Sequence, residues 1–388
     1  MDWSRHAERL AAAVTHPVSR WRPAVASTPR HLFVPRWWQP DGDGWELRDG
    51  PADEARWASA AYSDAGSLVT RVGPLHADHA HPGDRPTGLP TSSSTHPSLV
   101  VRMLRHGMIS DGADLLIVGT GSGYSTALAC ARLGADRVTS VDVDGYLAKA
   151  ATERMASTGL APAVRELDAT GPLPGSYDRI VSMVAVRPVP ASWLAALRPS
   201  GRLVTTLENM PVIVTADKNE DGGADGEVQW DRAGFMRARH GADYPHPPGR
   251  GPGLRLGFGE QSAAARDQEG EHVGTGRYPV LNVREAWDVW SMLELTAPGI
   301  EHRFQEGPDR RRTAWMAHPD GSWARATATW TDPPEVHQSG PQRLWDELER
   351  IRTRLNTEGA LPVYGAGVRI EPDGTMRLRR GKWSAVVP

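Results

Sequence analysis

The chain has 388 residues, of which 39% are hydrophobic and 23% are charged, and these proportions are typical of a globular protein rather than a disordered or fibrous one. The formal net charge of −3 excludes a strong long-range attraction to nucleic acid or to an anionic membrane surface. A chain of this length favours two domains over a single core.

The first hundred residues predict helices at both ends and a largely irregular middle. Residues 1–36 predict a helix followed by an extended, proline-containing segment. Residues 39–60 are polar and predict a loop, and residues 71–93 carry Gly, Pro, His and Ser without periodicity and predict a long loop. A helix is expected after Pro97, where apolar residues recur at helical spacing.

Strand and helix patterns then alternate from Asp114 to about Leu207. The expected strands are 115–118, 138–141, 164–167, 180–184 and 202–207, and the expected helices are 124–133 and 146–157. The first strand is a short, continuous apolar run, as in a strand buried on both faces. The alternation predicts an α/β fold with a doubly wound parallel sheet.

The last part of the chain predicts a hairpin, a linker and a smaller α+β unit. The hairpin pairs residues 211–216 with 228–235 around a polar turn at 218–226. We expect three parts: a catalytic domain over residues 1–240, a linker or long loop over 241–278, and an accessory domain over 279–388. Within the accessory domain, the expected helices are 283–295 and 341–355, the expected strands lie near 313–316 and 323–330, and a terminal hairpin covers 368–378.

A glycine-rich turn between the first strand and the first helix of the α/β section is a candidate cofactor site. It consists of Gly119, Thr120, Gly121, Ser122 and Gly123. Glycines allow close approach of a ligand to the backbone, and the following helix offers unpaired N–H groups. Asp142 ends the next strand, where its carboxylate would accept from ribose hydroxyls, and Asp168 follows the third strand, where it would accept from an adenine amino group. The turn lacks the Gly-x-Gly-x-x-Gly pattern that binds a pyrophosphate, which argues against a dinucleotide. A dinucleotide site and a turn that binds no ligand stay as alternative interpretations.

Six segments in order resemble the protein-L-isoaspartate O-methyltransferase family. They are Pro29–Pro35, Ala61–Asp64, Ser94–Pro97, Gly119–Tyr124, Tyr177–Ile180 and Leu197–Leu203. The resemblance implies a Rossmann-like S-adenosylmethionine-dependent methyltransferase sheet with a smaller α+β C-terminal domain. It implies that the glycine turn, Asp142 and Asp168 bind S-adenosyl-L-methionine and release S-adenosyl-L-homocysteine.

The same resemblance implies a substrate site in the segment 61–97. Thr95, with Ser94 and Ser93, would hold the carboxylate that is methylated, and Tyr62, Asp64 and His96 would contact the substrate. The chain departs from the family pattern: Thr95-His96-Pro97 stands where the family has Ser-Gln-Pro, and Ile117 replaces an acidic residue before the glycine turn. The residues alone leave an alternative for each of these roles. The hydroxyl run also fits a solvated loop. Asp64 also fits a brace of its own turn, and His96 also fits a solvated residue at the start of a helix.

The remaining chain resembles a branch of this family found beside ribosomal-peptide maturases. The segments that carry this resemblance are Thr91–Thr95, Pro319–Arg325 and Pro341–Glu347. The branch acts on lanthipeptide, graspetide or imiditide precursors, which implies esterification of an Asp side chain and closure to an aspartimide (succinimide), with either aspartimide or isoaspartate as the final product. The expected partner is thus a peptide, with no nucleic acid and no membrane. The alternatives are isoaspartate repair, a small-molecule methyltransferase, and a non-catalytic peptide-binding protein.

Two further sequence features, a histidine run and a single cysteine, are not expected to form functional sites. His76, His79 and His81 form a His-x-x-His-x-His run, but no cysteine or clear fourth ligand accompanies them, so we expect no metal. Cys130, the single cysteine, lies in an apolar stretch and is expected to be a buried hydrophobe. The absence of disulfides and of an apolar signal-peptide core leads us to expect a cytoplasmic protein.

Overall fold

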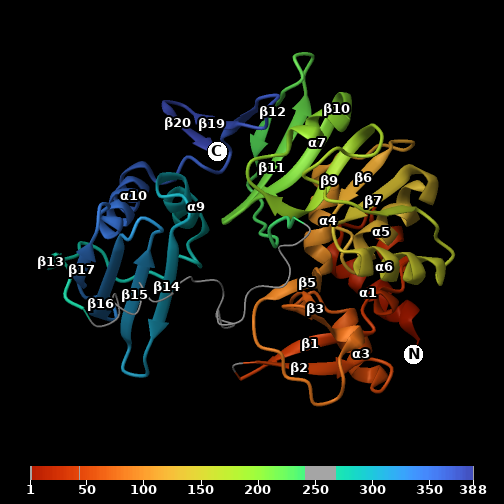
Figure 1. Cartoon of the computed structure of the whole chain (residues 1–388), viewed down its shortest axis with the longest axis horizontal. Coiled ribbons are helices and arrows are strands. Elements are labelled where there is room, and N and C mark those ends of the chain that lie inside the picture. Colours follow the sequence, from red (N-terminus) through yellow and green to blue (C-terminus); the bar gives the residue numbers. More distant parts are fainter. Residues whose placement is uncertain (1, 43, 241–267, 388) are drawn as a thin grey trace.

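The computed structural model describes residues 2–42, 44–240 and 268–387, and the description below is of these residues. Three β-sheets organise them (Figure 1). A ten-stranded sheet forms the centre, a five-stranded sheet near the N-terminus lies below it, and a second five-stranded sheet carries most of the C-terminal third.

The central sheet contains a parallel core of five strands in the order β8-β7-β6-β9-β10. The strands are β6 (Leu115–Val118), β7 (Val138–Asp142), β8 (Ala163–Glu166), β9 (Tyr177–Val186) and β10 (Leu197–Leu207). The chain order reverses between β6 and β9, as in a Rossmann-like sheet, where ligands bind beyond the carboxyl ends of the strands. The predicted α/β fold class is confirmed.

Helices cover both faces of this core. They are α1 (Trp3–Val14), α2 (Arg22–Ser27), α4 (Pro97–His106), α5 (Tyr124–Leu133), α6 (Gly145–Ala156) and α7 (Ala191–Ala196). All four residues of β6 are buried, and they alternate between two cores: Leu115 and Ile117 join the core that contains α4 and α5, while Leu116 and Val118 join the core that contains α7. The apolar run of β6 is explained by burial on both sides.

Antiparallel strands extend the central sheet and include the C-terminus. They are β11 (Met210–Lys218), β12 (Ala224–Val228), β18 (Gly367–Ile370), β19 (Met376–Arg380) and β20 (Trp383–Val387). The predicted hairpin is confirmed, but its second strand is β12 and not 228–235. The sequence pattern missed β12 because its exposed residues Asp225 and Glu227 make the strand look like a polar turn. β18 pairs with β12, so the last residues belong to the central sheet and not to a separate unit that begins at residue 279.

The N-terminal sheet corrects two predictions, because residues 39–60 and 71–93 are not simple loops. Its elements are β1 (Arg36–Asp41), β2 (Gly44–Asp49), α3 (Glu54–Ala61), β3 (Leu68–Val72), β4 (Leu75–His76) and β5 (Pro90–Ser94), with 3₁₀ turns η1 (Arg30–Phe33) and η2 (Ala77–His79). A small core around Trp38 stabilises it, and the Trp38 indole N–H donates to the Leu75 carbonyl at 3.3 Å. A core built around a few tryptophans leaves no regular spacing of apolar residues in the sequence. The strands of this sheet were therefore not predicted.

The third sheet has the order β13-β17-β16-β15-β14. Its elements are β13 (His272–Thr275), β14 (Glu301–Glu306), β15 (Arg311–Ala317), β16 (Trp323–Thr329) and β17 (Glu335–Ser339), with helices α9 (Trp287–Thr296) and α10 (Leu344–Glu358). The predicted linker 241–278 falls largely on residues 241–267, outside the described residues, and its described end contributes β13. No described helix combines the length and apolar character that crossing a bilayer requires.

Candidate functional site

A crevice opens beyond the carboxyl ends of β6, β7 and β9, at the point where the strand order reverses. Four segments contribute to it: the turn after β6, the ends of β7 and β8, the segment around β5, and residues 235–239. Residues from the first three segments are Thr91, Ser92, Ser93, Thr95, Gly119, Thr120, Gly121, Ser122, Asp142 and Asp168, together with apolar side chains such as Leu147 and Leu167. The crevice is therefore lined by most of the residues that the sequence predicts to bind the cofactor and the substrate carboxylate.

Backbone hydrogen bonds fix the glycine turn at the mouth of the crevice. The N–H groups of Gly119 and Thr120 donate to the Val141 carbonyl at 2.9 and 3.2 Å. Gly119 has φ +88°, and a Cβ there would lie 2.9 Å from Val184 Cγ1, so only glycine fits without displacement. The turn presents backbone to the crevice because side chains have no room there.

The polar side chains of the turn point into the protein. The Thr120 hydroxyl bonds to the Ser140 hydroxyl at 2.7 Å, and Ser122 Oγ accepts from the Tyr124 N–H at 3.4 Å. Gly123 does not line the crevice; with φ +91° it is the N-cap residue of α5. These three residues shape the turn, and what a ligand meets at this edge is mainly peptide backbone.

Two carboxylates stand at the ends of β7 and β8. Asp142 is buried; its two oxygens accept from the N–H groups of Gly121 at 2.9 Å and Asp144 at 3.1 Å. Burial raises the pKa of Asp142. Partial burial acts in the same direction on Asp168, but hydrogen bonds from Thr170 and His240 prevail and lower its pKa.

The hydroxyl segment Thr91–Thr95 lies against the glycine turn. A Cβ built on Gly121 would be 3.6 Å from the Ser93 carbonyl oxygen, and Ser93 and Thr95 both line the crevice. Ser94 does not: it is 1% exposed, and its hydroxyl accepts from Arg30 at 3.3 Å. The Ser94 hydroxyl is thus turned toward Arg30 and away from the crevice that Ser93 and Thr95 line.

Arg30 positions the hydroxyl segment, and the sequence reading gave it no role. Its guanidinium is fully buried and donates to the carbonyls of Ser94 at 3.2 Å and Thr95 at 3.1 Å, and to that of Ala61. Burial lowers the pKa of Arg30. The only signal for it was its place in the segment Pro29–Pro35, which resembles the family.

The three predicted substrate contacts lie away from the crevice. Tyr62 bonds through its hydroxyl to His31 Nδ1 at 2.7 Å, and with Asp64 it lines a separate surface depression beside α1. Asp64 Oδ1 accepts from the Ser98 N–H at 2.8 Å, in the first turn of α4. The His96 ring contacts the Ser67 hydroxyl at 3.4 Å. Asp64 therefore supports the start of α4, a role that differs from the brace of its own turn considered from the sequence.

Residues 235–239 cover one side of the crevice, which the sequence did not indicate. The Ala185 N–H donates to the Met236 carbonyl at 2.9 Å, and the Ala238 N–H donates to the Ala185 carbonyl at 2.7 Å. This extended segment thus attaches to the end of β9 and brings Phe235, Arg237 and Arg239 to the crevice. A single strand-like stretch of mixed polarity carries no periodic signal for such a contact.

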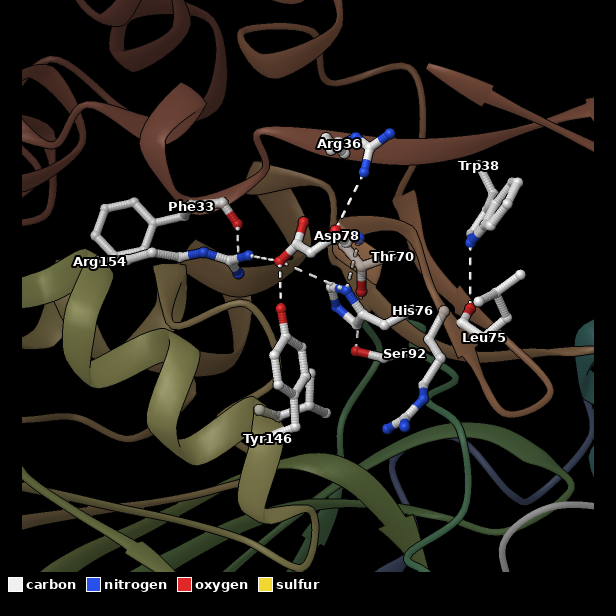
Figure 2. Close-up of polar contacts among 12 residues, drawn as sticks. Phe33, Arg36, Trp38, Thr70, Leu75, His76, Asp78, Ser92, Tyr146 and Arg154 are labelled. Atoms are coloured by element: carbon white, nitrogen blue, oxygen red, sulfur yellow. Dashed lines mark hydrogen bonds and ion pairs between the residues drawn. The ribbon is translucent and has the colours of Figure 1, made fainter. Parts of the chain in front are cut away.

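His76, the first histidine of the run, belongs to a bracing network (Figure 2). Asp78 accepts from the Tyr146 hydroxyl at 2.8 Å and from the Arg154 guanidinium, while His76 Nδ1 accepts from the Asp78 N–H at 3.1 Å. Tyr146 and Arg154 belong to α6, so the network fastens the N-terminal sheet to the helix that follows Asp142. Within the described ranges, no three His, Cys, Asp or Glu side chains are grouped as metal ligands. Cys130 is buried, and burial raises its pKa to about 12.

Comparison with known proteins gives one consistent result. The profile of the family described as protein-L-isoaspartate(D-aspartate) O-methyltransferase (PCMT) matches residues 85–231. A protein-L-isoaspartate O-methyltransferase of Methanopyrus kandleri is 33% identical over 225 residues, which cover 56% of this chain and 83% of that relative. The chain belongs to the PCMT family. A further PCMT relative, from Anaeromyxobacter dehalogenans strain 2CP-C, is 37% identical over 147 residues, 36% of this chain and 69% of its own length.

The predicted family and the predicted enzyme class are confirmed by these matches. A solved PCMT structure aligns over 99% of this chain and 98% of its own, with a TM-score of 0.47 and 17% identity. These relatives are named as isoaspartate methyltransferases, which agrees with the alternative function given above, while the resemblance to a peptide-maturation branch stays a prediction.

Proposed function

We propose that this PCMT protein transfers a methyl group from S-adenosylmethionine to the carboxylate of an isoaspartyl residue in a peptide or protein. One observation carries the proposal: the glycine turn 119–123 and the hydroxyl segment ending at Thr95 face the same crevice. Family membership supplies the reaction class, and the juxtaposition supplies a place for donor and acceptor to meet.

The residues of the crevice fit S-adenosylmethionine. The glycine turn offers backbone without Cβ atoms, as a close-lying methionine moiety requires. Asp142 can accept from ribose hydroxyls with the lone pairs that its two N–H partners leave free, and Asp168 lies beyond Leu167 at the adenine end. When bound, S-adenosylmethionine supplies an electrophilic methyl group on a sulfonium.

The protein's task in this reaction is alignment rather than proton removal. The substrate carboxylate is already ionised at neutral pH and attacks as it is. Thr95 would donate its hydroxyl hydrogen to one carboxylate oxygen, so that the other oxygen points at the methyl carbon. As the new O–C bond forms, the C–S bond breaks and its electron pair stays on sulfur. Arg30 holds the Thr95 carbonyl and so fixes the approach.

The direct test uses a pair of short peptides that differ only in one residue, isoaspartate in one and aspartate in the other. Incubation with S-adenosylmethionine should add one methyl ester to the isoaspartyl peptide and leave the aspartyl peptide unchanged, as measured by mass spectrometry. Failure to methylate the isoaspartyl peptide, with S-adenosylhomocysteine binding intact, would contradict the proposed substrate but not the cofactor.

A second candidate is methylation of an ordinary Asp in a ribosomally made precursor, followed by closure to aspartimide. The supporting observation is the large C-terminal part, β13–β20 with α9 and α10, of which α9 and the start of β14 wall a groove beside the crevice. An enzyme for short damaged sites has no need of such a wall. Co-expression with a precursor should then yield loss of one water from the peptide, and turnover of a short isoaspartyl peptide should be poor.

A further inference from the structure

A groove continues from the crevice into the C-terminal part of the chain. Five residues line both spaces: Thr91, Phe235, Met236, Arg237 and Arg239. The far wall of the groove comes from α9 and the start of β14, with Arg284, Trp290 and His302 among its residues. A peptide whose reacting side chain enters the crevice would therefore pass its flanking residues along this wall.

Arg284 is a positive charge in this wall that forms no direct ion pair, although the charge of Glu301 acts on it. In the part of the chain that the structure describes, its guanidinium makes no salt bridge and its buried Nε has no hydrogen-bond acceptor. Burial lowers the pKa of Arg284, and the charge of Glu301 opposes this shift. The guanidinium carbon lies 5.8 Å from the centre of the Trp290 ring, which packs edge-on against His302 with 5.3 Å between ring centres. Burial lowers the pKa of His302 to about 4, so at neutral pH the positive charge in this trio belongs to Arg284.

The rest of the groove also carries positive side chains, although not unbalanced ones. Arg237 lies 3.8 Å from Glu208, and both line the groove. Arg239 lies near Asp142 and tends to lower the pKa of that carboxyl. Glu301 is the other acidic residue of the lining. The lining of the groove thus contains three arginines and two glutamates, an excess of one positive charge.

A buried ion pair attaches the wall to the catalytic sheet. Glu294 of α9 is 1% exposed and accepts from Arg187 Nη1, at the end of β9, at 2.6 Å. The same carboxylate oxygen accepts from the Gly299 N–H at 3.0 Å, next to the start of β14. These contacts anchor α9 and the start of β14, which carry the wall, beside the crevice, as a specificity site requires.

We infer that this groove binds the peptide flank of the methylated residue and that Arg284 selects a second carboxylate, an Asp or Glu side chain on that flank. The inference rests on the proposed function for the crevice and adds the substrate class. A guanidinium held on an aromatic face with free donors binds a carboxylate through charge-assisted hydrogen bonds, and the Trp290 surface accommodates the apolar part of the same residue. An acidic flank would supply the direct hydrogen-bonded partner that Glu301, which acts on Arg284 only through its charge, does not supply within the described residues.

The test measures binding and methylation separately. A set of isoaspartyl peptides carries one Glu at successive positions on either side of isoaspartate, and a matching set carries Gln. Binding to protein saturated with S-adenosylhomocysteine is followed by fluorescence anisotropy. We expect one position at which Glu binds roughly tenfold more tightly than Gln, and we expect Arg284→Gln to abolish this preference while Arg284→Lys keeps part of it.

Arg303→Gln is the matched control, because Arg303 lies over Trp315 at 5.7 Å in the same part of the chain but does not line the groove. It should leave the Glu preference unchanged. Equal affinity for Glu and Gln at every position, or a preference that survives Arg284→Gln, overturns the inference even if the peptides are methylated. A Glu preference that depends on Arg284 without any methylation upholds the groove and contradicts the proposed function instead.

Discussion

The buried ion pair between Arg187 and Glu294 offers a quantitative test of how the C-terminal wall is attached. The Glu294 side chain is 1% exposed and that of Arg187 is 10% exposed. Glu294→Ala removes the carboxylate and leaves the arginine buried without a counter-charge, which typically costs about 3–5 kcal/mol. The free energy of unfolding, measured by urea titration, should fall by this amount, and peptide binding in the groove should weaken with it.

Two comparison variants separate this effect from ordinary truncation. Arg354 and Glu358 form an exposed pair at 2.9 Å, and Glu358→Ala should cost less than about 1 kcal/mol. The double variant Arg187→Met/Glu294→Leu leaves no unpaired charge and should lose less stability than Glu294→Ala alone. A Glu294→Ala protein that is no less stable than Glu358→Ala would refute the reasoning, because the wall would then not depend on the pair.

Three further predictions concern the N-terminal sheet and the crevice. Burial lowers the pKa of His76 to about 4, so between about pH 6.5 and pH 4 the unfolded chain binds a proton that the folded chain does not. The free energy of unfolding should therefore fall by up to about 3 kcal/mol as the pH drops through this range. Urea titrations at several pH values should show a smaller fall for His76→Gln. Thr95→Val should lower kcat/KM about 10- to 100-fold in a methyl-transfer assay with little change in S-adenosylhomocysteine affinity by calorimetry, while Thr95→Ser keeps most activity; equal loss in both would contradict a hydroxyl role. Asp142→Asn should raise the Kd for S-adenosylhomocysteine at least about tenfold, because an amide has one acceptor oxygen for the two N–H groups of Gly121 and Asp144, whereas exposed Asp225→Asn serves as the neutral control.

The parallel core could be predicted from sequence because its signals are local. β6 is a pure apolar run, and α5 covers 124–133 as expected. The strand β12 was misplaced, since its outward residues Asp225 and Glu227 made it look like a turn. Its pairing with β18 joins distant parts of the chain, and no local pattern indicates such a partner.

The candidate site was predictable where backbone geometry decides, and less so where side-chain direction decides. Gly119 and Asp142 follow from their places at strand ends. Ser94 was wrongly grouped with Thr95 because residue types do not show that it faces Arg30. The role of Asp64 in supporting the start of α4 needs the fold, as does the approach of residues 235–239 to the end of β9.

The central claim is that a methyl donor in the crevice meets an isoaspartyl carboxylate at the hydroxyl segment. It is tested most directly by transfer of label from methyl-labelled S-adenosylmethionine to an isoaspartyl peptide, with the product then treated with mild base. We predict label in the peptide that base releases as methanol, as a methyl ester requires, and a transfer about 10- to 100-fold less efficient in Thr95→Val. Base-stable label, or no label in any isoaspartyl or precursor peptide, would contradict the account.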